Sequence, residues 1–127
     1  MYYTTQKISS RGGLIIYLND KFDYEEKYKL DYFDKWEGQI IELKQGPNLM
    51  KPITIGNFYR LPRELIENYT EFTSEFSPIL SKLDKSKKET VLTGDFNIDL
   101  LKLNDKAHIN EYFDTLISNS FYTKITY

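Results

Sequence analysis

The residues most suited to chemistry in this sequence are Asp95 and Asn97, which are two positions apart and follow the apolar segment 90–92. Gly94 allows the backbone to turn just before them. Side chains alternate between the two faces of an extended chain, so Asp95 and Asn97 point to one face, while Phe96 points to the other and anchors the segment. A carboxylate beside an amide at the end of a core strand is suited to binding a metal ion or a phosphate.

This segment has two alternative interpretations. Asp95, Asn97 and Asp99 have the alternate spacing of a calcium loop, but an EF-hand requires Gly and Glu at positions that Leu100 and Lys106 occupy here. The EF-hand interpretation is therefore excluded. A plain Asx turn, in which the side chain of an Asp bonds to the backbone two residues on, stays open as the alternative.

A second polar strand end lies upstream, at Tyr59 and Arg60. If the strand that ends there is a neighbour of segment 90–92 in one sheet, Tyr59 lies close to Asp95. A phenol hydroxyl beside the pair of Asp95 and Asn97 can hold a scissile phosphate, with Mg²⁺ on the carboxylate. The three side chains together therefore predict a phosphate site at one end of the sheet.

Other residues are weaker candidates. Gly12 and Gly13 either bring backbone amides close to a phosphate or only begin a hairpin. Glu42 lies between apolar residues of a strand, where we expect a solvated glutamate and not a metal ligand. His108, the only histidine, lies near the start of the second predicted helix, and we expect a surface or helix-start residue and not a catalytic base.

The strands that position these residues are visible as short apolar or alternating stretches. The predicted strands are residues 14–18, 38–44, 51–59 and 90–92, with a further strand at 121–127. The second and third of these form a plausible antiparallel hairpin. Residues 21–36 are predicted as a polar connector with an irregular edge strand.

Two helices are predicted from apolar residues at helical spacing. The first begins with a capping box formed by Asn68 and Glu71, and Pro78 is expected to kink or break it. The second starts near Asp105. Strands that alternate with helices make this an α/β chain.

The composition limits the class of protein. A chain of 127 residues with 40% hydrophobic and 28% charged residues is one globular domain or less. A net charge of −2 argues against a strongly basic nucleic-acid clamp, although a metal-dependent site does not need one. Without cysteine, a signal peptide or an apolar run of about 20 residues, we expect no membrane association and an intracellular protein of the nucleus or cytoplasm.

Four blocks of the sequence, in this order, resemble the endonuclease/exonuclease/phosphatase superfamily, and in particular the apurinic-like endonuclease of LINE-type (non-LTR) retrotransposons. The blocks are residues 10–17, 57–62, 92–101 and 121–126, and the Gly-Asp-Phe-Asn of the third is the most specific. The resemblance implies a partial two-sheet α/β sandwich of the DNase I-like type, with mixed, mostly antiparallel strands and two helices. It also implies Mg²⁺-dependent phosphodiester hydrolysis, with DNA as the partner.

The resemblance assigns roles to three residues of this chain. It implies that Asp95 activates or positions the attacking water and contacts the metal, and that Asn97 and Tyr59 contact the phosphate. Arg60, together with the Gly12 and Gly13 backbone, is a weaker candidate for phosphate binding.

Other parts of the family site have no counterpart in residues 1–127. The metal-binding Glu and a further Asn belong upstream of the Arg-Gly-Gly segment, and an Asp–His pair belongs downstream of Tyr127. We therefore expect residues 1–127 to be a single incomplete domain, a fragment of a DNA-nicking endonuclease with little or no activity alone. The alternative is a non-catalytic retroelement remnant or binding module that keeps the scaffold, with a further protein segment completing the sheet.

Overall fold

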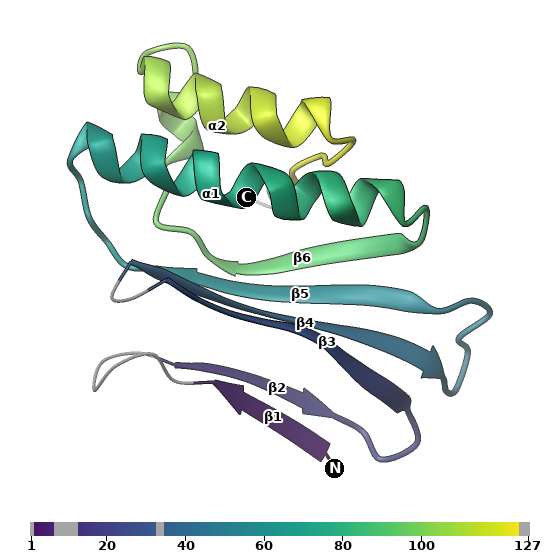
Figure 1. Cartoon of the computed structure of the whole chain (residues 1–127). Helices are drawn as coiled ribbons and strands as arrows, with labels where there is room; N and C mark the ends of the chain where they lie inside the picture. The colour runs from purple at the N-terminus through teal and green to yellow at the C-terminus, as the bar shows by residue number, and fades with distance from the viewer. Residues whose placement is uncertain (1, 7–12, 33–34, 125–127) are drawn as a thin grey trace. The chain divides into compact units, whose positions relative to one another are not determined.

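The computed structural model of the protein describes residues 2–6, 13–32 and 35–124, with side chains from residue 13 onward. The described chain is a mixed α/β structure with a four-stranded, mostly antiparallel sheet, a two-stranded sheet and two helices (Figure 1). It divides into two compact units, Met1–Pro62 with Lys88–Asn97 and Arg63–Lys87 with Ile98–Tyr127. In chain order the elements are β1 (Tyr2–Gln6), β2 (Leu14–Leu18), β3 (Asp23–Tyr32), β4 (Trp36–Gln45), β5 (Ile53–Arg60), α1 (Ile66–Lys85), β6 (Glu89–Asp95), the 3₁₀ turn η1 (Leu100–Lys102) and α2 (Ala107–Ser118).

The strands of the larger sheet have the order β3-β4-β5-β6. β4 pairs antiparallel with both β3 and β5, so the predicted hairpin of β4 and β5 is confirmed. β6 pairs parallel with β5, because α1 separates the two strands in the chain and a crossover of that length can return the chain in the same direction. β2 has the predicted bounds, whereas β4 and β6 are longer at both ends than the sequence predicts.

Residues 21–36, predicted as a polar connector with an irregular edge strand, contain the ten-residue strand β3, which is terminal in the order of the larger sheet. The irregular edge strand is therefore confirmed, but it takes up most of the segment, where the sequence predicts mainly a loop. The register shifts between Glu26 and Tyr28, so β3 has one residue, Lys27, more than β4 at this point. Such a bulge moves the following side chains to the opposite face. It therefore hides the strict alternation by which a strand is recognised in a sequence.

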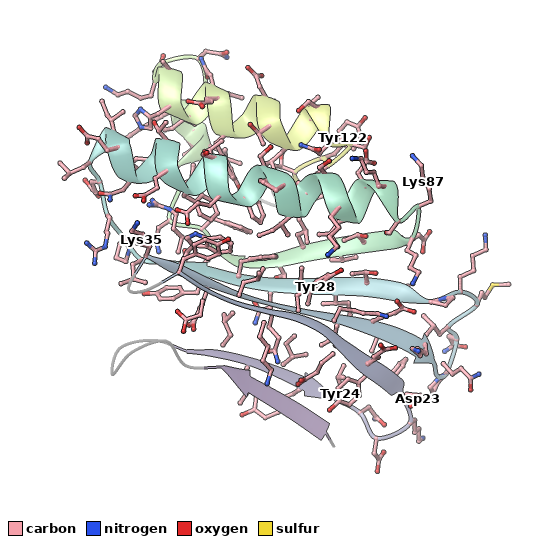
Figure 2. All side chains as sticks on the ribbon, viewed as in Figure 1. Asp23, Tyr24, Tyr28, Lys35, Lys87 and Tyr122 are labelled. Atoms are coloured by element: carbon pink, nitrogen blue, oxygen red, sulfur yellow. The ribbon has the colours of Figure 1, made fainter. Side chains whose placement is uncertain are left out.

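The core of the first unit lies where the small sheet packs on the large one. Leu18 of β2 is buried together with Ile41 and Leu43 of β4. Partly buried hydrophobic residues surround this cluster, namely Ile16, Phe22, Tyr24, Leu49 and Ile55 (Tyr24 is labelled in Figure 2). Because side chains alternate along a strand, the odd-numbered residues of β4 and β5 share the face that β2 covers.

Helix α1 differs from the prediction at its start and at its proline. It begins at Ile66, with Leu65 as the N-cap, and the backbone N–H of Asn68 already bonds to the Leu65 carbonyl oxygen at 2.9 Å. Asn68 is therefore inside the first turn, and the predicted capping box is wrong. The helix also continues through Pro78 to Lys85, so the predicted break is absent.

The two helices pack against each other through aromatic residues. Phe72 of α1 lies 6.1 Å from Tyr112 of α2 and 5.0 Å from Phe76, measured between ring centroids. The predicted apolar faces are confirmed by the buried residues, which are Phe72, Phe76, Leu80 and Leu83 on α1 and Ile109, Tyr112 and Leu116 on α2. Among the described residues, no helix is long and apolar enough to cross a membrane.

Residues 121–124 do not form the start of the predicted last strand, and residues 125–127 lie outside the described residues. The end of α2 accounts for this difference. Ser120 has a φ of 65°, its N–H bonds to the Ile117 carbonyl oxygen at 3.0 Å, and the N–H of Phe121 bonds to the Leu116 carbonyl oxygen at 2.9 Å. These two bonds make a Schellman motif, so Phe121 belongs to the helix end.

Candidate functional site

The carboxyl ends of β5 and β6 are neighbours in the first unit. In this parallel pair Tyr59 is the register partner of Asp95, and Asn57 is the partner of Thr93. The prediction that Tyr59 lies close to Asp95 is therefore confirmed. Register partners share a face of the sheet, and at this position Tyr59 is half-buried while Asp95 is exposed.

Gly94 allows β6 to approach β5 closely at this point. Its φ is +139°, a conformation that residues with a side chain rarely adopt. A Cβ atom placed on Gly94 would lie 1.9 Å from the carbonyl oxygen of Phe58 and 2.7 Å from its nitrogen. These are backbone atoms that cannot rotate away, so glycine is required here by the contact between the strands as well as by its positive φ. Gly94 is itself part of β6, so the turn expected at this residue begins only at Asp95.

The segment after β6 is an Asx turn. The backbone N–H of Asn97 donates to Asp95 Oδ1 at 3.1 Å, and Asn97 has a φ of 50°. The expectation that Asp95 and Asn97 extend from one face of a continuous strand is therefore wrong, because the strand ends at Asp95. The alternative interpretation as an Asx turn is correct: the side chain of Asp95 bonds to the backbone of Asn97.

Arg60, at the end of β5, donates hydrogen bonds to the backbone of this turn. Its Nε donates to the Phe96 carbonyl oxygen at 2.7 Å, and its Nη2 donates to the Asn97 carbonyl oxygen at 2.8 Å. In return, Asn97 Nδ2 donates to the Arg60 carbonyl oxygen at 2.6 Å. Arg60 is only 2% exposed, so its guanidinium is committed to the protein interior and to the turn.

Phe96 anchors the turn as the sequence predicts. Its ring centroid lies 5.9 Å from that of Phe58, and the two rings are stacked. Phe58 is itself 1% exposed and lies 6.2 Å from Trp36 between ring centroids. The turn is therefore attached to the aromatic core of its unit as well as to Arg60.

Two polar residues of β4 extend this site and were not identified from the sequence. Glu37 is the register partner of Tyr59, and Gln39 is the partner of Asn57. Both are buried, with exposures of 1% and 0%. Like the core residue Ile41, both are odd-numbered and lie on the face of β4 that β2 covers. Their spacing from Ile41 is the signal in the sequence that could have identified them. Glu37, Tyr59 and Asp95 thus form one row across three adjacent strands, about 5 Å apart from strand to strand.

The glycines near the N-terminus add little to the site. Gly13 is exposed, has a φ of 143° and directly precedes β2. Gly12 lies outside the described residues. The structure therefore places the start of a hairpin strand at this point.

Glu42 and His108, two of the weaker candidates, each contact another side chain of the protein. Glu42 is 6% exposed, and Lys88 Nζ donates to its Oε2 at 2.6 Å, so the expectation of a solvated glutamate is wrong. That bond, together with the charges of Lys88, Lys27 and Lys44, lowers the pKa of the Glu42 carboxyl. His108 is the second residue of α2, so the expected helix-start position is confirmed. It is half-buried, with its ring 4.6 Å from that of Tyr69.

The acidic residues near the site are few. Within residues 2–6, 13–32 and 35–124 there is no group of three or more His, Asp or Glu side chains that could hold a metal ion. Asp95 contributes one carboxylate, and its Oδ1 accepts the N–H of Asn97. Because proteins often hold Mg²⁺ through one or two carboxylates together with water and substrate phosphate, Asp95 is the residue of the turn that could contact this ion.

The arrangement still has the groups to bind a phosphate diester. The Tyr59 hydroxyl can donate to a phosphate oxygen, and the Asp95 carboxylate can accept a hydrogen bond from a water molecule. The bond to Arg60 uses one of the two amide hydrogens of Asn97, and an amide nitrogen carries two. A phenol, a carboxylate and an amide are thus positioned by β5, β6 and the turn that follows β6.

Comparisons of the chain with models of protein families, with curated proteins and with solved structures find no match in any of the three.

Proposed function

We propose that the protein carries the central part of a phosphodiester-hydrolysing site of the endonuclease/exonuclease/phosphatase type, related to the DNA-nicking endonucleases of LINE-type retrotransposons. The observation that carries the proposal is the parallel register of β5 and β6, which pairs Tyr59 with Asp95. This pairing was predicted from the same sequence blocks that resemble the superfamily. The packing of β1–β2 on the larger sheet agrees with a two-sheet α/β sandwich of the DNase I-like type.

In this proposal the three residues of the site have separate roles. The carboxylate of Asp95 accepts a hydrogen bond from the attacking water and orients it. The hydroxyl of Tyr59 and the second amide hydrogen of Asn97 donate to the oxygens of the phosphate, where negative charge increases during the reaction. Arg60, which the resemblance suggested as a phosphate ligand, is assigned no contact with the substrate because its guanidinium bonds to the turn.

The superfamily uses Mg²⁺, which when bound stabilises the charge on the phosphate. Asp95 is the residue of the turn that would contact it, and no group of three or more acidic or histidine side chains that could hold a metal is found among the described residues. Residues that act as one catalytic unit lose activity together. We therefore expect slow or absent hydrolysis by this chain alone.

A second candidate function is DNA binding without hydrolysis. The observation that favours it is the lack of a three-residue metal group among the described residues, beside a site that still has phosphate donors. β6 is the terminal strand in the order of the larger sheet. A segment of another protein could therefore add to it and complete the sheet, as unpaired strand edges allow.

The experiment is a nicking assay on supercoiled plasmid in Mg²⁺ with the Asp95→Asn variant. Asparagine keeps the Oδ1 acceptor for the N–H of Asn97 and removes the charge. Asp99→Asn is a matched control, because Asp99 is also exposed and its Oδ1 accepts the N–H of Leu101 at 3.0 Å. If the wild type nicks DNA, Asp95→Asn should lower the rate about 100-fold or more, and Asp99→Asn should leave it unchanged.

Binding of a DNA duplex, followed by fluorescence anisotropy, separates the two candidates. Binding that weakens in Tyr59→Phe, without nicking, supports the binding module. Nicking of equal rate in the wild type and in Asp95→Asn would exclude Asp95 from catalysis. A wild type that neither binds nor nicks DNA would overturn both candidates.

A further inference from the structure

We infer that Arg60 is a positioning residue, which fixes the turn of Asp95 and Asn97 by bonding to its backbone and does not contact the substrate. This inference rests on the proposed function of that turn. The place of Arg60 beside Tyr59 in the sequence suggests phosphate binding. The inference assigns Arg60 a different role.

The first argument is the geometry of the guanidinium. Nε and Nη2 of Arg60 donate to two successive carbonyl oxygens, those of Phe96 and Asn97, at 2.7 and 2.8 Å. The planar guanidinium presents donors in a fixed fork, so two bonds to adjacent carbonyls define the orientation of the peptide between them. Bonds from a charged donor are also stronger than neutral ones.

The second argument is that the contact is reciprocal. Asn97 Nδ2 donates to the carbonyl oxygen of Arg60 at 2.6 Å, so the end of β5 and the turn hold each other in both directions. Asn97 has a φ of 50°, in the left-handed region that asparagine adopts more readily than most residues. The ladder of β5 and β6 places Asp95 beside Tyr59, and the bonds of Arg60 fix the following residues of the turn.

The third argument is the face on which Arg60 lies. Side chains alternate along β5, so Arg60 shares the face of Phe58, while Tyr59 is on the other face with Asp95. Arg60 is 2% exposed and Phe58 is 1% exposed. Tyr59 and Asp95 therefore lie on one face of the sheet, and the guanidinium of Arg60 lies on the other.

The test uses NMR spectroscopy of the whole chain. The Nε–H signal of Arg60 in the wild type should exchange slowly with solvent and show coupling across a hydrogen bond to the Phe96 carbonyl. On addition of a short DNA duplex, the amides of Asp95 and Asn97 should shift strongly and the Arg60 Nε–H signal only slightly. A large shift of the Nε–H signal would show a direct contact and overturn the inference.

The Arg60→Lys variant keeps the charge and removes the fork. In the folded variant at low temperature, the Asn97 backbone amide should exchange faster and DNA affinity should fall about tenfold, whereas the amides of β3 and β4 should be unchanged. The control Arg63→Lys alters an exposed arginine three residues away and should change neither measurement. If Arg60 only adds stability, Arg60→Lys should lower the melting temperature without changing the exchange rate of the Asn97 amide or the affinity for DNA. That outcome would refute the positioning role.

The measurements also distinguish this inference from the proposed function. If the wild type does not bind DNA, the proposed function fails. The exchange rate of Asn97 in Arg60→Lys then still decides whether Arg60 orders the turn. If Arg60→Lys does not fold, the wild-type Nε–H signal decides the same point by itself.

Discussion

Replacing Gly94 by alanine should separate β6 from β5 at the candidate site. The new Cβ would lie 1.9 Å from the Phe58 carbonyl oxygen and 2.8 Å from its carbonyl carbon, which is closer than such atoms can approach. Phe58 is in the middle of the aromatic core and cannot move without cost. The expected response is that the end of β6 moves away, and with it Asp95 moves away from Tyr59.

The size of the effect follows from two contributions. A non-glycine residue at a φ of +139° costs about 2 kcal/mol. Forcing a methyl group against packed backbone costs about 2 kcal/mol more. A loss near 4 kcal/mol is a large part of the typical unfolding free energy of about 5–15 kcal/mol, and corresponds to a fall in the melting temperature of about 15 °C for a chain of this size.

The matched control is Gly56→Ala on the neighbouring strand. There the added Cβ meets side-chain atoms, Leu92 Cδ2 and Phe58 Cε2, both at 2.7 Å. Side chains can rotate aside in part, so the cost should be about 1.5 kcal/mol. Urea unfolding at 25 °C, followed by circular dichroism, gives both free energies.

The same substitution should also weaken DNA binding, which is measured at low temperature. The folded fraction of Gly94→Ala should bind a duplex more weakly than Gly56→Ala does, because only the first substitution displaces Asp95. If Gly94→Ala is as stable as Gly56→Ala and binds DNA as well as the wild type, the close approach of the two strands is not what positions the site.

Two further predictions concern stability. Glu42→Gln should lower the unfolding free energy by about 1 kcal/mol at pH 7, since Lys88 is half-exposed and its pair with Glu42 is partly screened. The pKa of Glu42 is lowered in the folded protein, so this stabilisation is present above the unfolded value near 4.5 and is lost as the pH falls through the folded value. Pro78→Ala should raise the unfolding free energy by about 1–3 kcal/mol, because it restores a backbone N–H inside the continuous helix α1.

Each of these has a simple check. Glu26→Gln, which breaks an exposed pair with Lys29 at 3.5 Å, should change the unfolding free energy by less than about 0.5 kcal/mol. A difference between the wild type and Glu42→Gln that is as large at pH 3 as at pH 7 would contradict the assigned cause. Pro78→Ala would argue against an unbroken α1 if its urea midpoint were equal to or below that of the wild type.

The elements were predictable from the sequence wherever their signal is local. β2 is a short apolar run, and α1 and α2 have apolar residues at helical spacing, so each was found from its own residues. The pairing of Tyr59 with Asp95 was also predictable, because two strands that end in polar residues and belong to one sheet bring those ends together.

The missed elements share a different cause. The bulge at Lys27 breaks the alternation of β3, and the Schellman motif at Ser120 takes Phe121 into the end of α2. In both cases a single irregular residue changes the face or the secondary structure of the residues that follow. No periodicity in the sequence reports such a residue.

The sequence by itself therefore determined which polar residues meet at the end of β5 and β6. Only the tertiary structure decided how they are held: the Asx turn of Asp95, the two bonds from Arg60 to the turn, and the row of Glu37 beside Tyr59. The physical reason is that Arg60 bonds to residues 36 and 37 positions away. Such contacts depend on which strands are neighbours and on which face each side chain lies, whereas the pattern of hydrophobic residues depends only on the local chain.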